Sequence, residues 1–109
     1  MIQVIFYFAN EIILITIRGN HITFANSDFG AKEAPIEGLR LSHDGVIQEF
    51  PQLKDNHNWK EEAIVLFKNK IKQYNSEQEV ADYIIQDLKK FGYQPKYMQR
   101  QGFRRVALK

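Results

Sequence analysis

Apolar and polar residues alternate along residues 2–26, which is the periodicity of a β-strand with two different faces. The pairs Asn10-Glu11 and Gly19-Asn20 interrupt the alternation, and each has the length of a two-residue hairpin loop. The pattern therefore predicts a three-stranded antiparallel meander. Counting outward from the two loops, we expect these cross-strand pairs: Phe8 with Ile13, Phe6 with Ile15, Val4 with Ile17, Ile17 with Ile22, and Ile15 with Phe24.

The two faces of this meander differ in composition. One is wholly apolar and consists of Val4, Phe6, Phe8, Ile13, Ile15, Ile17, Ile22 and Phe24. The other is mixed and carries Gln3, Ile5, Tyr7, Leu14, Thr16, Arg18, His21, Thr23 and Ala25. We expect helices to bury the apolar face, because a sheet needs a packed partner on its apolar side. The mixed face could meet water, another element or a ligand.

A second hairpin is expected over residues 39–50. The pair Asp44-Gly45 suits a type I′ turn, in which both central residues adopt positive φ. Counting outward places Arg40 opposite Glu49, a favourable cross-strand pair of opposite charges. Pro51 would end the second strand.

The periodicity then changes from two to about 3.6 residues and predicts two helices, over residues 59–74 and 77–91. Asn58 with Glu61, and Ser76 with Glu79, have the spacing of a capping box at a helix start. Gly92 fits the position after the last turn of the second helix. Because only two residues separate the helices, we expect a helical hairpin.

Residues 96–108 alternate again and predict an extended segment, which Gly102 could bend. The predicted fold is α+β: an N-terminal three-stranded antiparallel meander plus a second β-hairpin, covered on one face by a two-helix hairpin, with a C-terminal extended β segment. At 109 residues we expect a single domain over residues 1–109.

Composition narrows the classes of protein. The chain has 44% hydrophobic and 26% charged residues, which is the ordinary range of a globular domain. It contains no cysteine, which excludes disulfides and thiolate chemistry. No apolar run approaches the ~20 residues of a membrane helix, and the start lacks the basic region of a signal peptide. We therefore expect a cytoplasmic protein without a membrane partner.

Side chains with catalytic potential have simpler explanations in this sequence. His21, His43 and His57 show no paired metal-ligand spacing, and the six glycines match no phosphate-binding fingerprint. No serine lies in a nucleophile elbow. We therefore expect no catalytic residue, metal or cofactor. A small enzyme whose carboxylates meet only in three dimensions is kept as an alternative.

The end of the chain is basic, with seven Lys or Arg and no acidic residue from Lys89 to Lys109. Aromatic residues alternate with the cations there, a composition that suits nucleic-acid phosphates and bases. Lys89 and Lys90 have another explanation, because cations are favoured at any helix C-terminus. A nucleic-acid-binding function would use Lys96, Tyr97, Arg100, Phe103, Arg104 and Arg105.

The competing hypothesis, which we prefer, is a non-enzymatic domain for protein interaction or self-association. Its contact surface would be the mixed face, in particular Tyr7, Thr16, Arg18, His21 and Thr23. The strand over residues 2–8 is rich in apolar residues and would be a hazard as an unpaired edge. Pairing of this strand with a second copy would give a homodimer.

Overall fold

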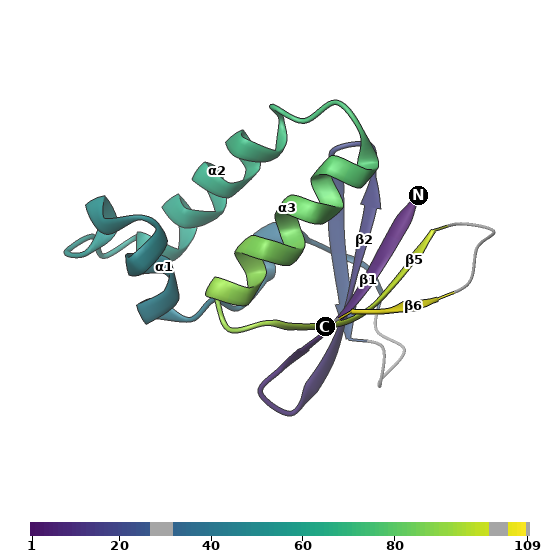
Figure 1. Cartoon of the computed structure of the whole chain (residues 1–109). Helices are drawn as coiled ribbons and strands as arrows, with labels where there is room; N and C mark the ends of the chain where they lie inside the picture. The colour runs from purple at the N-terminus through teal and green to yellow at the C-terminus, as the bar shows by residue number, and fades with distance from the viewer. Residues whose placement is uncertain (27–31, 101–104, 109) are drawn as a thin grey trace.

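The computed structural model describes residues 1–26, 32–100 and 105–108, which form an α+β fold with one six-stranded antiparallel sheet (Figure 1). The strand order is β4-β3-β2-β1-β5-β6. The strands are β1 (Ile2–Phe8), β2 (Glu11–Arg18), β3 (His21–Asn26), β4 (Ala34–Pro35), β5 (Gln94–Arg100) and β6 (Val106–Ala107). The helices are α1 (His43–Glu49), α2 (Trp59–Ile71) and α3 (Glu77–Lys90), with short 3₁₀ turns η2 (Ile36–Gly38) and η3 (Pro51–Leu53).

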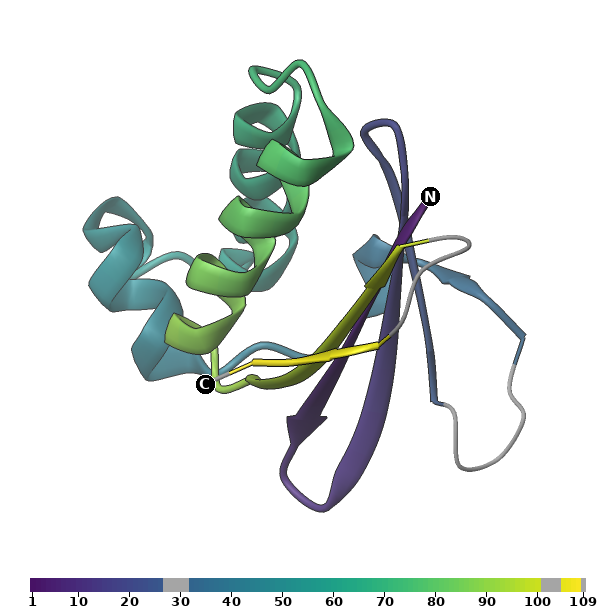
Figure 2. The same ribbon diagram turned by 45° about the vertical axis from the view of Figure 1, so that its right-hand side comes forward.

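All three α-helices lie on the same side of the sheet, as Figure 2 shows. The apolar face of the meander packs against them, as the sequence predicts. Val4, Phe6 and Ile15 are fully buried, whereas Phe8 and Phe24 at its margins are half-buried. The helices contribute Phe67, Ile84 and Leu88 to the same core. The predicted α+β class and the side of the sheet that the helices cover are therefore confirmed.

The predicted register of the meander is correct at the second turn and wrong at the first. Gly19-Asn20 is the second loop, and Ile17 faces Ile22 as expected. The first loop is Ala9-Asn10 instead of Asn10-Glu11, so Phe8 faces Glu11 and each pair between β1 and β2 is displaced by two residues. Ala9 accepts a φ of +54° to make this turn. A slip of two residues keeps each side chain on its face, so the alternation alone does not detect it.

Strand β1 lies inside the sheet, because β5 pairs with its second side. The predicted C-terminal extended segment is therefore confirmed for β5 and β6, while Gly102, where we expected a bend, lies outside the described residues. The register shifts between Ile5 and Phe6, so Lys96 is the extra residue of a β-bulge beside Pro95. Since β1 is not an edge strand, the expectation that it recruits a second copy by strand pairing is wrong.

Residues 39–50 contain helix α1 and not the second hairpin that we predicted. Ser42 begins the helix, and its Oγ accepts a hydrogen bond from the Gly45 amide at 3.3 Å. Val46 and Phe50, four residues apart, are both buried, which is the spacing of a helix face. Arg40 consequently pairs with Glu11, and the expected pair with Glu49 does not form.

The two predicted helices are confirmed as α2 and α3, each ending slightly earlier than expected. Ser76 caps α3, since its Oγ accepts from the Glu79 amide at 3.1 Å. Asn58 is at the N-cap of α2, but its side chain makes no capping bond, so the first capping box is wrong. Gly92 (φ +103°) ends α3, and the Tyr93 amide bonds the Leu88 carbonyl at 2.8 Å, which makes a Schellman motif.

None of the helices in residues 32–100 combines the length and the apolar content that crossing a membrane requires.

Candidate binding face of the sheet

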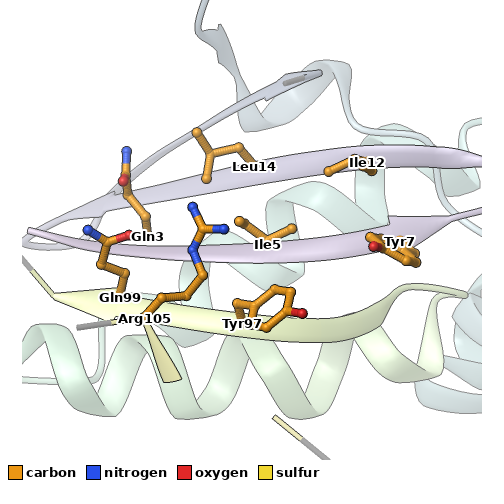
Figure 3. Close-up of a pocket in the computed structure, with 8 residues that line it drawn as sticks. All are labelled: Gln3, Ile5, Tyr7, Ile12, Leu14, Tyr97, Gln99 and Arg105. Carbon is orange, nitrogen blue, oxygen red and sulfur yellow. The ribbon is translucent and has the colours of Figure 1, made fainter. Parts of the chain in front are cut away.

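The mixed face of the sheet points away from the helices and contains a shallow pocket of about 290 Å³, which we call the open-face pocket. Figure 3 shows its side chains standing on β1, β2 and β5, with the helices behind the sheet. Described residues that line it are Gln3, Ile5, Tyr7, Ile12, Leu14, Tyr97, Gln99 and Arg105. Most of the residues that line the pocket thus come from β1 and β5, two strands that are far apart in the sequence.

Strand pairing explains why these side chains meet. Ile5 of β1 lies between Leu14 of β2 and Tyr97 of β5, so three apolar side chains form a row across the sheet. Tyr7 lies beside Ile12 in the same way, two residues further along β1. The aliphatic residues are half-buried and make the floor of the pocket.

Each tyrosine of the pocket has a cation over its ring. The Lys96 Nζ lies 5.3 Å from the centroid of the Tyr7 ring, and the Arg105 Cζ lies 5.6 Å from that of Tyr97. Such cation–π contacts at exposed sites contribute about 0.5–1 kcal/mol each. Tyr7 and Tyr97 are still 40% and 39% exposed, so both rings can contact another molecule.

The polar end of this face begins at Thr16, opposite the pocket residue Gln3, and contains an ion pair. Arg18 contacts Glu33 at 3.1 Å, and this contact holds the pKa of the Glu33 carboxyl below its usual value. The hydroxyls of Thr16 and Thr23 also lower that pKa, although neither meets the geometry of a hydrogen bond. Thr16 is only 1% exposed, so it is not available as a contact residue.

The predicted interaction face is therefore divided. Tyr7 belongs to the open-face pocket, whereas Arg18, Thr16 and Thr23 belong to the polar end. His21 lines a separate pocket between β3 and α2, together with Glu37 and Lys68. Glu37 and Lys68 form an ion pair there.

The predicted nucleic-acid segment is divided as well. Lys96, Tyr97 and Arg105 come together on the open face. Arg100 contacts the side chain of Gln78 on α3, so it turns toward the helices. Phe103 and Arg104 lie outside the described residues. Of the preceding lysines, Lys90 is held by Glu49 at 2.8 Å.

Ile12 and Gln99 line the pocket but were missed by the sequence analysis, whereas Gln3, Ile5 and Leu14 were placed on the mixed face without being singled out as contact residues. With the predicted loop Asn10-Glu11, Ile12 falls opposite Ala9 and not opposite Tyr7, its partner in the sheet. The alternation from Leu14 back to Ile12 is the signal that could have included it. No local signal places Gln99 beside Gln3, because their contact depends on the pairing of β1 with β5.

A second group of charged residues joins the three helices. Glu49 of α1 contacts Lys90 of α3 at 2.8 Å and Lys70 of α2 at 3.2 Å. The hydrogen bond from Lys90 is the main reason that the pKa of Glu49 lies below its usual value. Asp87 is 3% exposed beside Tyr83, and burial together with this carboxylate raises the pKa of Tyr83. Because these pairs connect α1 to α2 and α3, we assign them a structural role.

The histidines do not gather with other ligands in the described ranges. His43 makes an edge-to-face contact with Trp59, with ring centroids 4.7 Å apart, at the start of α1 and not beside the hairpin turn we predicted. His57 lies in the loop before α2. Within residues 1–26, 32–100 and 105–108, no group of three or more His, Asp or Glu side chains could hold a metal ion.

Comparison with known proteins adds no assignment, since no family model, no curated protein and no solved structure matches this chain.

Proposed function

We propose that this chain is a protein-binding domain, and that the open-face pocket receives a segment of a partner protein. The observation that carries the proposal is the half-buried apolar floor of Ile5, Ile12 and Leu14, flanked by the exposed rings of Tyr7 and Tyr97, on a sheet whose opposite face is used by the helices. Exposed apolar surface of this kind is characteristic of interaction sites. Tyr7 and Tyr97 add amphipathic rings, which are enriched at protein interfaces.

The size of the pocket supports a partner side chain better than a large ligand. Its volume of about 290 Å³ falls at the lower limit of pockets that bind drug-sized molecules, ~300–1,000 Å³. Most of the side chains that line it are spread along β1, β2 and β5, as Figure 3 shows. A polypeptide can therefore place one side chain in it while the rest of the segment follows the surface.

Nucleic-acid binding is the second candidate, and one specific observation favours it. Lys96 and Arg105 lie beside Tyr7 and Tyr97, a combination of cations and rings that single-stranded nucleic acid can use. We rank it second because Arg100 and Lys90 are engaged on the helical side, which disperses the basic charge of the chain end. Affinity for phosphates depends on several cations acting on one surface.

The proposal is tested by selecting peptides from a random library displayed on phage and measuring how the selected peptides bind three versions of the chain. Leu14→Gln replaces part of the pocket floor with a polar group of similar length. Val65→Gln is the matched control, because Val65 is 56% exposed on α2. Thermal melting followed by circular dichroism checks that both variants fold.

We expect Leu14→Gln to lower the affinity for the selected peptides by about tenfold, since a buried anchor of an interface contributes over ~1 kcal/mol to binding. Val65→Gln should change affinity by less than about twofold. Equal effects of the two substitutions would contradict the proposal. Binding of a single-stranded oligonucleotide that weakens steeply with salt, without competition from the peptides, would favour the second candidate.

Self-association through the same face is a special case of this function. Size-exclusion chromatography over a range of concentrations detects it, and Leu14→Gln should then restore the monomer. The homodimer, the cytoplasmic location and the absence of enzymatic activity stay predictions.

A further inference from the structure

We infer that the open-face pocket recognises a bulky apolar side chain together with a carboxylate beside it on the partner chain. This inference rests on the proposed function and specifies the chemistry of the partner. Its two halves come from the two ends of the pocket, which differ in the groups they present.

The apolar half follows from the floor. Ile5, Ile12 and Leu14 offer only aliphatic surface, and all three are half-buried before any partner is present. A side chain that covers them removes further apolar area from water, at about 25 cal/mol per Å². A leucine, isoleucine or phenylalanine fits the volume of about 290 Å³, whereas a small polar side chain would leave the floor uncovered.

The carboxylate half follows from Arg105, Gln3 and Gln99, which lie together at one end of the pocket (Figure 3). The described lining contains a guanidinium and two amides but no acidic residue. Arg105 forms no ion pair within residues 1–26, 32–100 and 105–108. Among the described residues, none therefore neutralises the positive charge of Arg105 at this end of the pocket.

The acid of the neighbouring polar end, where Thr16 pairs with Gln3, does not supply a counter-charge. Glu33 is held by Arg18 at 3.1 Å, next to Thr16 and Thr23. Charge complementarity thus selects an acidic partner for Arg105. The planar guanidinium can donate two parallel hydrogen bonds to a carboxylate, and the glutamine amides can donate further ones.

The position of Arg105 favours this use. Its guanidinium lies over the ring of Tyr97, and this contact restrains a side chain that would otherwise lose much of its freedom on binding. Pre-organisation of this kind lowers the entropic cost of recognition. Arg105 and the apolar floor then contact adjacent parts of one ligand.

Four small probes separate the two halves of the inference. N-acetyl-leucine carries a terminal carboxylate, and N-acetyl-leucinamide is its neutral counterpart. Acetyl-Leu-Glu-amide carries the carboxylate on a side chain, and acetyl-Leu-Gln-amide is the neutral match. Titrations followed by NMR of the methyl groups of Ile5 and Leu14 report binding at the pocket, with the methyl groups of Val65 on α2 as a remote reference.

We expect at least one acidic probe to bind about fivefold or more tightly than its neutral match, because charge-assisted hydrogen bonds are the stronger ones. The pair that shows the preference identifies the source of the carboxylate, a chain terminus or an acidic side chain. Arg105→Gln should abolish the preference, and Arg105→Lys should reduce it. Lys54→Gln, which removes an exposed cation after η3, should leave it unchanged.

Equal binding of acidic and neutral probes to the original chain would overturn the inference, as would a preference that survives Arg105→Gln. If the methyl signals of Ile5 and Leu14 still shift in either case, the apolar contact is present and the proposed function is not contradicted. Absence of shifts with all four probes overturns the inference too. The proposed function fails separately, when the peptides selected on phage are indifferent to Leu14→Gln.

Discussion

Gly45 of α1 faces the last carbonyl of α3 so closely that a Cβ built on it would lie 1.8 Å from the Lys90 oxygen. No side chain fits in that space, so the glycine permits α1 to approach the C-terminal end of α3. The Ser42 amide donates to the Phe91 carbonyl at 3.0 Å in the same contact. The approach of these two helices is thus a backbone-to-backbone contact.

Gly45→Ala should therefore destabilise the fold severely, by about 3 kcal/mol or more, because the clash is with backbone that cannot move aside. Gly38→Ala is the matched control. Its Cβ would meet the Phe24 ring at 3.4 Å, which is close to ordinary contact, so we expect a change within about 1 kcal/mol. Urea denaturation measures both values, and similar losses for the two variants would contradict the explanation given for Gly45.

The same glycine shows why sequence reasoning failed at residues 39–50. Asp44-Gly45 is compatible with a type I′ turn, but it also fits the first turn of a helix that Ser42 caps. The reason for a glycine here is the Lys90 carbonyl, which is distant in the sequence. Local turn chemistry could not reveal that contact.

Helices α2 and α3 were predictable because their signals are local: the 3.6-residue periodicity, Ser76 as a cap and Gly92 as a stop. The faces of the meander were predictable because alternation survives a slip of two residues. The open-face pocket was only partly predictable. Tyr7 and Tyr97 were named under different hypotheses, and only the pairing of β1 with β5 places them on one surface.

The two faces of the sheet predict opposite outcomes for neighbouring residues of β2. Ile15→Ala should cost about 2–5 kcal/mol, since Ile15 is fully buried against the helices and its loss leaves a cavity. Leu14→Ala on the open face should cost clearly less, because that side chain is half-buried. Ile15→Asp should abolish folding by burying a charge. Equal urea midpoints for the two alanine variants would show that both faces are buried.

The two helix starts should respond differently to loss of their caps. Ser76→Ala removes the acceptor of the Glu79 amide and should cost about 1 kcal/mol. Asn58→Ala should cost less than about 0.5 kcal/mol, since the Asn58 side chain makes no capping bond. Thermal unfolding of the two variants measures the difference. A larger loss for Asn58→Ala would mean that its side chain caps α2 in solution.

The pH dependence of stability should report the contacts of Glu49. Lys90 and Lys70 hold its pKa below the usual value in the folded chain, so the folded state binds the proton less readily than the unfolded state. The resulting stabilisation is fully present above the ordinary glutamate pKa of ~4.3 and is lost as the pH falls through the lowered value. Glu49→Gln should thus cost about 1 kcal/mol at pH 7 and nearly nothing at about pH 2.

Asp55→Asn is the control for this titration. Asp55 is exposed in the turn after η3 and, unlike Glu49, belongs to none of the ion pairs found in the described ranges. Urea midpoints of the original chain and both variants should be measured between about pH 2 and pH 7. The gap between the original chain and Glu49→Gln should narrow only on the acid side of ~4.3, the ordinary glutamate pKa. A gap that stays constant over the whole range would mean that the charge of Glu49 does not contribute to holding α1 against α2 and α3.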